Sequence, residues 1–301
     1  AHIASNLNSL NSLSSSLLGT ITVSDSNPVA MTYTQYQADT NVIRALGSAN
    51  LTVSAVDAAL VASLYANSHI TSMTVTDTAA NIVSDIATLA SDISKISSIT
   101  VSNASSNPVE SITYSAYTNT ANQAVLSKLP ASVHFTVGGV SVANFATTVA
   151  NSNVTSAQVV DTIAHLQSSI DDLQTSVLKI SSIAASDSAT LNITATQLVN
   201  DASVLAKLDP AITWNVTGFT NGTPVTLSLF NYQQLAPALE TLEARYRDTH
   251  IYVTPNTSSL ADYLTASTAI SSDSHASVLI PNAAKAGSAV TLSLDNYSGH
   301  A

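Results

Sequence analysis

The sequence predicts an α/β fold: a right-handed solenoid of strand–helix repeats with a parallel sheet on one face. The first reason is internal repetition, because residues 70–102 resemble residues 154–186 at a constant offset of 84 positions. Asp77 and Asp161 are related by this offset, as are Ile99 and Ile183. A repeat of this length indicates units that bury their apolar faces against one another.

The second reason is that strand patterns and helix patterns alternate within each unit of about 84 residues. We expect three strand–helix modules per unit. In the clearest unit, the expected strands are 72–77, 97–102 and 133–140, and the expected helices are 79–93, 115–129 and 141–151. Residue 77 or 78 is the expected N-cap of the first helix. This alternation implies parallel strands joined by right-handed crossovers.

The third reason is the period of two within the strands, which separates an apolar face from a hydroxyl face. The residues expected to point inward are Leu51, Val53, Met73, Val75, Ile99, Val101, Phe135 and Val137. Those expected to point outward are Thr52, Ser54, Thr74, Thr76, Thr100, Ser102 and Thr136. Charge normally protects exposed sheets from association, and this face carries almost none.

The repeats predict how the chain is divided. We expect a repeat solenoid over residues 1–218, with units near 10–78, 79–162 and 163–218, and a divergent terminal or assembly region over 219–301. In that region TLSLFNY at 226–232 returns as TLSLDNY at 291–297. Neither end resembles a polar cap, so we expect contacts between copies near residues 6–18, a helix-like segment, and 220–300.

Composition excludes several classes of protein. The net charge is −11 with only 8 Lys and Arg, which argues against a nucleic acid or an anionic membrane as partner. There is no cysteine, so disulfides and cysteine-ligated metals are excluded. No apolar run reaches the roughly 18 residues that would predict a membrane span. Only 9% of the residues are charged, and the polar half of the sequence is Ser, Thr and Asn.

Three phrases carry a resemblance to a known class: VTDTAANI (75–82), KISSITVSN (95–103) and MTYTQYQAD (31–39). They resemble the Ala/Ser/Thr-rich repeats of large alphaproteobacterial surface proteins that are secreted by type I systems. The resemblance covers roughly residues 10–215 and implies a bacterial protein at the cell surface or outside the cell. The GGxGxD calcium repeat of that class is absent here, since Val140 follows Gly138-Gly139, so calcium-driven folding is not carried over.

Few residues suggest chemistry. The seven histidines, none of them three or four positions from another, are interpreted as scattered surface residues: His2, His69, His134, His165, His250, His275 and His300. Asp171 and Asp172 are expected on the solvated face of a helix, because adjacent helical residues do not face each other. Glu243 and Arg247 predict an exposed helix over 240–248, with a docking surface as the alternative.

Tyrosines recur at equivalent places in two units, as Tyr33 and Tyr36 and as Tyr114 and Tyr117. A structural role at the strand–helix junction is favoured over a platform for stacking sugars. No GxSxG, P-loop, HExxH or GxGxxG pattern occurs. We therefore assign no catalytic, cofactor-binding or metal-binding residue, and we expect no enzyme activity and no cofactor.

The favoured hypothesis is an extracellular structural repeat protein of a bacterial surface layer, filament or adhesin that self-assembles into a polymer or lattice. The first alternative is a glycan-binding module that uses the Ser/Thr-rich sheet face. A polysaccharide-processing enzyme is the weaker alternative, because Asp77 and Asp161 lie a full repeat apart.

Overall fold

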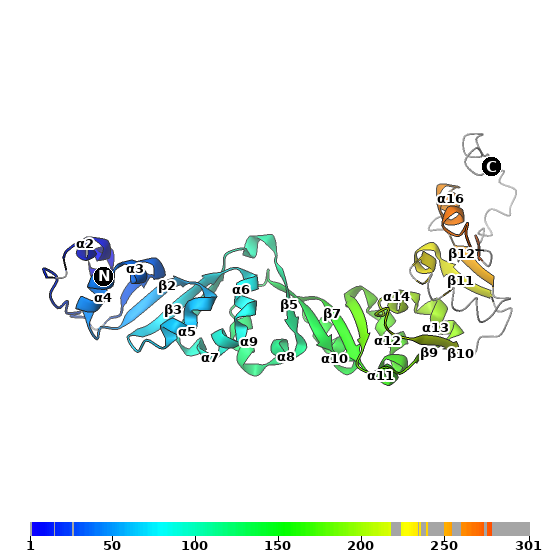
Figure 1. The fold of residues 1–301 in the computed structure, drawn as a ribbon, viewed down its shortest axis with the longest axis horizontal. Coiled ribbons are helices and arrows are strands. Elements are labelled where there is room, and N and C mark those ends of the chain that lie inside the picture. The colour runs from blue at the N-terminus through cyan, green and yellow to red at the C-terminus, as the bar shows by residue number, and fades with distance from the viewer. Residues whose placement is uncertain are drawn as a thin grey trace. The chain divides into compact units, whose positions relative to one another are not determined.

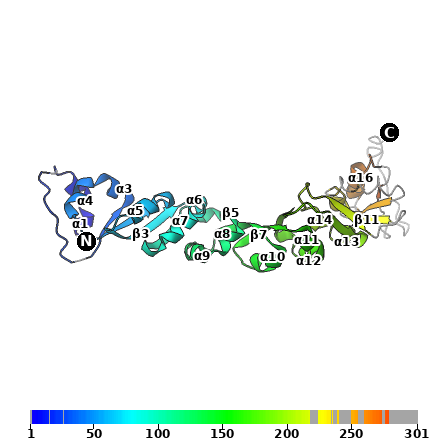
Figure 2. The same ribbon diagram turned by 60° about the horizontal axis from the view of Figure 1, so that its bottom comes forward.

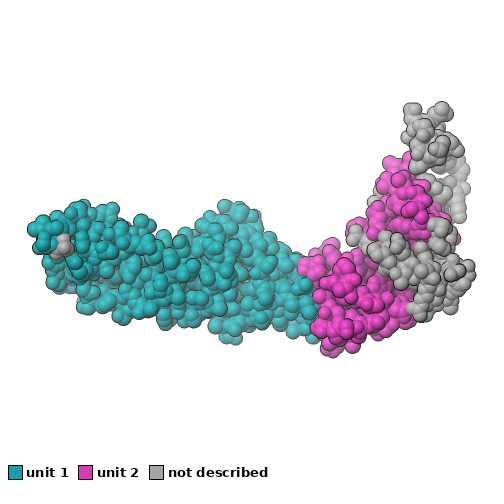
Figure 3. Space-filling view, in the orientation of Figure 1, with its two compact units in different colours: residues 1–160 teal, residues 161–301 magenta. Residues whose placement is uncertain are grey.

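The computed structural model describes residues 2–14, 16–25, 27–217, 224–233, 235, 239, 250–254, 260–273 and 276–278. The chain divides into two compact units, residues 1–160 and 161–301, which are coloured separately in Figure 3. Its fold is α/β, and every strand pair described here is parallel, as predicted.

The strands of unit 1 follow one another along the chain (Figure 1). They are β1 (Val29–Thr32), β2 (Leu51–Val56), β3 (Ile70–Asp77), β4 (Ile96–Val101), β5 (Val109–Thr113), β6 (His134–Val140) and β7 (Val154–Asp161). One sheet has the order β1-β2-β3-β4, and the next begins β5-β6-β7. Neighbours in space are therefore neighbours in the chain, which is the topology that successive crossovers produce.

Short helices connect these strands (Figures 1 and 2). They are α1 (His2–Ser5), α2 (Leu7–Asn11), α3 (Tyr33–Ala38), α4 (Thr40–Leu46), α5 (Val61–Tyr65), α6 (Ala79–Ser84), α7 (Ile86–Ser91), α8 (Tyr114–Thr118), α9 (Thr120–Leu126) and α10 (Val142–Val149). Three 3-10 turns complete the unit: η1 (Ala58–Leu60), η2 (Ile93–Lys95) and η3 (Ala104–Ser106).

Unit 2 continues the pattern. Its helices are α11 (Ile163–Ser168), α12 (Ile170–Thr175), α13 (Ala195–Asn200), α14 (Ala202–Leu205) and α16 (Leu260–Ala269), with the 3-10 turn η4 (Val177–Lys179). Its strands are β8 (Ile180–Ala185), β9 (Leu191–Thr194), β10 (Trp214–Thr217), β11 (Pro224–Ser228), β12 (His250–Thr254) and β13 (Ala276–Val278). β9 pairs with β10, and β11-β12-β13 form a separate sheet.

The predicted faces of the strands are confirmed. All eight residues expected to point inward are buried, from fully buried Val75 and Val137 to Ile99, which is 7% exposed. None of the seven expected to point outward is buried. Val75 and Val159 are equivalent fully buried positions, and Ile183 is buried like Ile99. The apolar core therefore follows the repeat.

Two predictions of local structure are corrected. The single helix expected over 79–93 is divided into α6, α7 and η2, because Asp85 adopts φ −96° and ψ 13°, outside the helical region. The helix expected over 115–129 is divided at Asn119, whose φ of −63° and ψ of 124° are extended and whose side chain caps α9. Each break lies at a polar residue, and at Asn119 the side chain also caps the helix that follows.

The 84-residue repeat also holds more strands than the three that we expected. β1 and β5 were missed, although each lies directly before a helix and ends in the threonine that caps it, Thr32 or Thr113. Each is short, and each directly follows a proline, Pro28 or Pro108, that predicts a turn rather than a strand.

A bulge recurs at the same place in two successive repeats. The β2–β3 register shifts between Val53 and Val56, and the β6–β7 register shifts between Val137 and Val140. The bulged residue has positive φ in both cases: 55° at Ala55 and 75° at Gly139. Glycine adopts this conformation without strain, whereas alanine does not.

Candidate functional site

A cluster of polar side chains lies where β3 meets α6, and we call it the junction. The Asp77 carboxylate accepts hydrogen bonds from the Thr78 N–H at 2.7 Å and from Asn81 Nδ2 at 2.7 Å through Oδ1, and from the Ala58 N–H at 2.9 Å through Oδ2. Partial burial alone raises the pKa of Asp77, but these hydrogen bonds hold that pKa below its ordinary value.

Two further groups close the start of α6. Thr78 is the N-cap, and its Oγ1 accepts from the Asn81 N–H at 3.3 Å, which confirms the predicted cap. The Ala79 N–H donates to Oδ1 of Asn103 at 2.9 Å. These side chains bind backbone groups that a helix terminus leaves unpaired, so the junction is a structural device.

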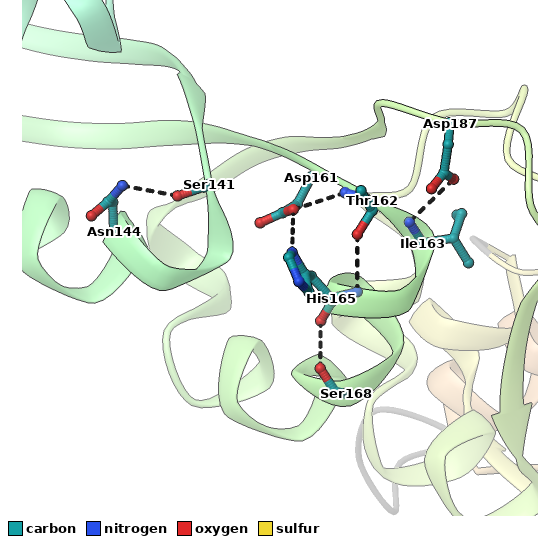
Figure 4. Close-up of polar contacts among 8 residues, drawn as sticks. All are labelled: Ser141, Asn144, Asp161, Thr162, Ile163, His165, Ser168 and Asp187. Carbon is teal, nitrogen blue, oxygen red and sulfur yellow. Dashed lines mark hydrogen bonds and ion pairs between the residues drawn. The ribbon is translucent and has the colours of Figure 1, made fainter.

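The same junction recurs 84 residues later, after β7 (Figure 4). Oδ1 of Asp161 accepts from the Thr162 N–H at 2.8 Å and from Nδ1 of His165 at 2.7 Å. Thr162 caps α11 through the His165 N–H at 3.3 Å, and the Ile163 N–H donates to Asp187 at 3.2 Å. The sequence changes Asn81 to His165 and Asn103 to Asp187, while these four contacts at the start of the helix recur.

The second junction brings together the residue types of a catalytic triad without its geometry. The hydroxyl of Ser168 donates to the backbone oxygen of His165 at 2.9 Å (Figure 4). A triad needs the serine hydroxyl on the imidazole nitrogen that is not bound to the carboxylate. His165 therefore acts as a partner of Asp161 at a helix start. Sequence reasoning treated His165 as a scattered surface histidine and missed this pairing, which the four-residue spacing from Asp161 could have indicated.

The outer sheet face of unit 1 is a second candidate. The register aligns Thr52 with Ser72 and Thr76 with Thr100, so hydroxyls lie side by side at the spacing of neighbouring strands, about 4.8 Å. Thr136 and Ser156 are within 3.3 Å of each other through their hydroxyls. This face offers an uncharged array of donors and acceptors.

The recurrent tyrosines lie in α3 and α8, each of which directly follows a strand. Asn67 Nδ2 donates to the Tyr36 hydroxyl at 3.1 Å. At the equivalent place, Tyr117 packs against Phe135 with ring centroids 6.0 Å apart, and burial raises the pKa of Tyr117. The Tyr33 ring stacks on Tyr36 at 6.5 Å. Both Tyr36 and Tyr117 are half-buried, which fits the structural role that the sequence favours.

One carboxyl pair was missed. Asp201 lies between α13 and α14, is 5% exposed, and hydrogen-bonds through its side chain to Asp171 of α12. Burial, this hydrogen bond and the charge of Asp171 raise the pKa of Asp201 to about 6. Gln197 Nε2 also donates to Asp171 at 2.8 Å. Asp171 and Asp172 are exposed on a helix as predicted, yet the relevant partner of Asp171 is 30 positions away in the sequence.

Within the described part of the chain, no group of three or more His, Asp or Glu side chains could hold a metal ion. The helix expected over 240–248 with Glu243 and Arg247, the returning segment 291–297, and His275 and His300 lie outside the described residues. The two junctions are built alike, and each of them lies at the start of a helix.

Comparison of the chain with models of protein families, with curated proteins and with solved structures gives no match in any of the three. Among the residues that the structure describes, no helix is long and apolar enough to cross a bilayer.

Proposed function

We propose that this chain is a structural repeat protein of the bacterial cell surface or exterior, and that it works by self-assembly into a filament, layer or adhesive polymer. The observation that carries the proposal is the recurrence of one hydrogen-bonded junction, at Asp77 and again at Asp161. Because the helix starts, the core and the bulge all repeat, most of the sequence specifies the repeated scaffold.

The proposal includes the right-handed solenoid, in which the successive parallel sheets are turns of one array. Sequential strand order and short connections support it. The resemblance to type I-secreted repeats supports an extracellular location, as does the absence of cysteine. The low charge of the outer sheet face supports association between copies, because like-charge repulsion is small.

Glycan binding is the second candidate, and the aligned hydroxyls of Thr52, Ser72, Thr76 and Thr100 favour it. Such a face would offer hydrogen bonds to sugar hydroxyls without a charged group. A glycan array probed with the wild-type chain and with Thr76→Val tests this directly, since valine keeps the shape of threonine and removes its hydroxyl.

Electron microscopy of the purified chain at rising concentration tests the leading proposal. We expect ordered fibres or a lattice, and the same material should be visible on the surface of the source cells. Monodisperse particles at every concentration would contradict self-assembly. If the chain also turned over a polysaccharide, the polysaccharide-processing enzyme would be the better explanation.

A further inference from the structure

Each repeat buries one polar side chain near the start of the second of its two consecutive short helices. These residues are Asp39, Asn122 and Asp201, near the start of α4, α9 and α14, and each is at most 6% exposed. In the second repeat the side chain is neutral, and Asn122 Nδ2 donates to the Ala116 carbonyl at 2.9 Å. A buried place of this kind is stable when its occupant is uncharged and hydrogen-bonded.

In the third repeat two carboxyl groups meet at this place. The side chain of Asp201 hydrogen-bonds to Asp171 of α12. A carboxylate only accepts hydrogen bonds, so a hydrogen bond between two carboxyl groups requires a proton between them. The charge that acts on Asp201 is that of Asp171, while Asp172 is exposed and α13 and α14 carry no titratable side chain. The folded chain therefore holds a proton at the Asp171–Asp201 pair.

The pair also joins α14 to its neighbours. The Val204 N–H, in the first turn of α14, donates to Oε1 of Gln174 in α12 at 3.0 Å. Gln197 Nε2 of α13 donates to Asp171 at 2.8 Å. Asp201 makes no side-chain hydrogen bond to the N–H groups of its own helix. The start of α14 is thus attached to α12 at the place where a second negative charge would arise if the pair lost its proton.

The residues directly after α14 cover one edge of β8. The Ile183 N–H donates to the Lys207 carbonyl at 2.7 Å, and the Asp209 N–H donates to the Ile183 carbonyl at 2.7 Å. On the opposite edge, the Ser186 N–H donates to the Asp161 carbonyl at 2.8 Å. Because α14 ends only two positions before Lys207, a displacement of α14 also displaces the covering segment.

We propose that the Asp171–Asp201 pair is a proton-dependent clamp on the edge of β8. With the proton in place, α14 stays against α12 and residues 207–209 cover Ile183. When the proton leaves, two like charges are in contact and Asp201 carries a buried charge, so α14 moves away from α12 and the edge opens. Acid therefore closes this edge and neutral pH opens it. The clamp is independent of the proposed self-assembly.

Amide hydrogen exchange against pH tests the clamp, because the N–H groups of Ile183 and Asp209 exchange when this edge opens. Burial and the charge of Asp171 raise the pKa of Asp201 to about 6 in the closed form, whereas the open form has the ordinary value of 3.8. We expect the protection factors of both amides to fall about a hundredfold as the pH rises from about 4 through about 6, and to level off above that. The protection of Ser186, on the opposite edge, should stay constant.

Three variants separate the clamp from other effects. Asp201→Asn introduces the side chain that the second repeat carries at this place, and the protection of Ile183 should then be independent of pH. Asp171→Asn removes the second charge and should make the fall in protection smaller. Asp172→Asn, at the exposed neighbour, should behave as the wild type.

The clamp is overturned if Ile183 and Asp209 keep their protection in the wild type up to about pH 7, or if Asp201→Asn shows the same loss. It is also overturned if Ser186 loses protection together with Ile183, since that result means a general opening of the structure rather than of one edge. If Asp201→Asn does not fold, an undiminished fall in Asp171→Asn overturns the clamp, and a smaller one supports it.

Discussion

The recurrent bulge allows a reciprocal exchange between two repeats. Ala55 has φ 55° and Gly139, its equivalent 84 residues later, has φ 75°. Both residues are exposed, and a Cβ at Gly139 would meet no atom within 4 Å. Neither substitution should therefore change packing, and only the backbone conformation should matter.

The magnitude follows from two opposing effects. An L-residue at positive φ costs about 1–2 kcal/mol in the folded state relative to glycine. Glycine also gives the unfolded chain more conformational entropy than alanine does, which lowers the free energy of unfolding by about 0.4–1 kcal/mol. We therefore expect Ala55→Gly to raise the free energy of unfolding by about 0.5–1 kcal/mol, and Gly139→Ala to lower it by a similar amount.

Urea unfolding followed by circular dichroism measures both variants, and the double variant serves as the control. Effects at separate sites add, so the double exchange should restore the wild-type value to within about 0.5 kcal/mol. A destabilising effect of Ala55→Gly would contradict this explanation. So would a Gly139→Ala variant with unchanged stability if Ala55→Gly does change it.

Three further changes probe the core, the caps and the carboxyl pair. Ile99→Asp should cost several kcal/mol because it buries an unpaired charge, whereas Ile99→Val should cost about 1 kcal/mol, and denaturant titration separates the two. A silent Ile99→Asp would mean that the strand register is wrong. Thr78→Ala should cost about 1 kcal/mol and Thr78→Ser almost nothing in the same assay, because the hydroxyl caps α6; equal losses would exclude a capping role. The raised pKa of Asp201 means that the folded state holds its proton more tightly, so the contribution of Asp201 to stability is greatest at low pH and is lost as the pH rises from about 4 through about 6, by up to about 3 kcal/mol. Thermal unfolding against pH should show this loss in the wild type and in Asp172→Asn but not in Asp201→Asn; a loss that persists in Asp201→Asn would assign it to another group.

The sequence allowed the strands to be predicted where the pattern had a period of two. Val75 and Ile99 are buried as expected, because a half-buried strand requires that alternation. The capping threonine Thr78 was found for a similar reason, since its role depends on residues next to it in the chain.

The remaining features depend on contacts that are distant in sequence. Asp85 divides a helix whose apolar spacing is continuous, and nothing in that spacing marks the break. Asp171 and Asp201 meet only because α12 packs against α14. The pairing of His165 with Asp161 could have been predicted from their four-residue spacing. Its structural role becomes clear only because Asn81 pairs with Asp77 in the same way.

We propose that the repeats stack into one array, and small-angle X-ray scattering of the monomer tests this proposal. A compact domain of 301 residues has a radius of gyration of about 19 Å. Stacked repeats extend along one axis, so we expect a radius of gyration well above this value and a pair-distance distribution with a long tail. A radius near 19 Å with a symmetric distribution would contradict the solenoid.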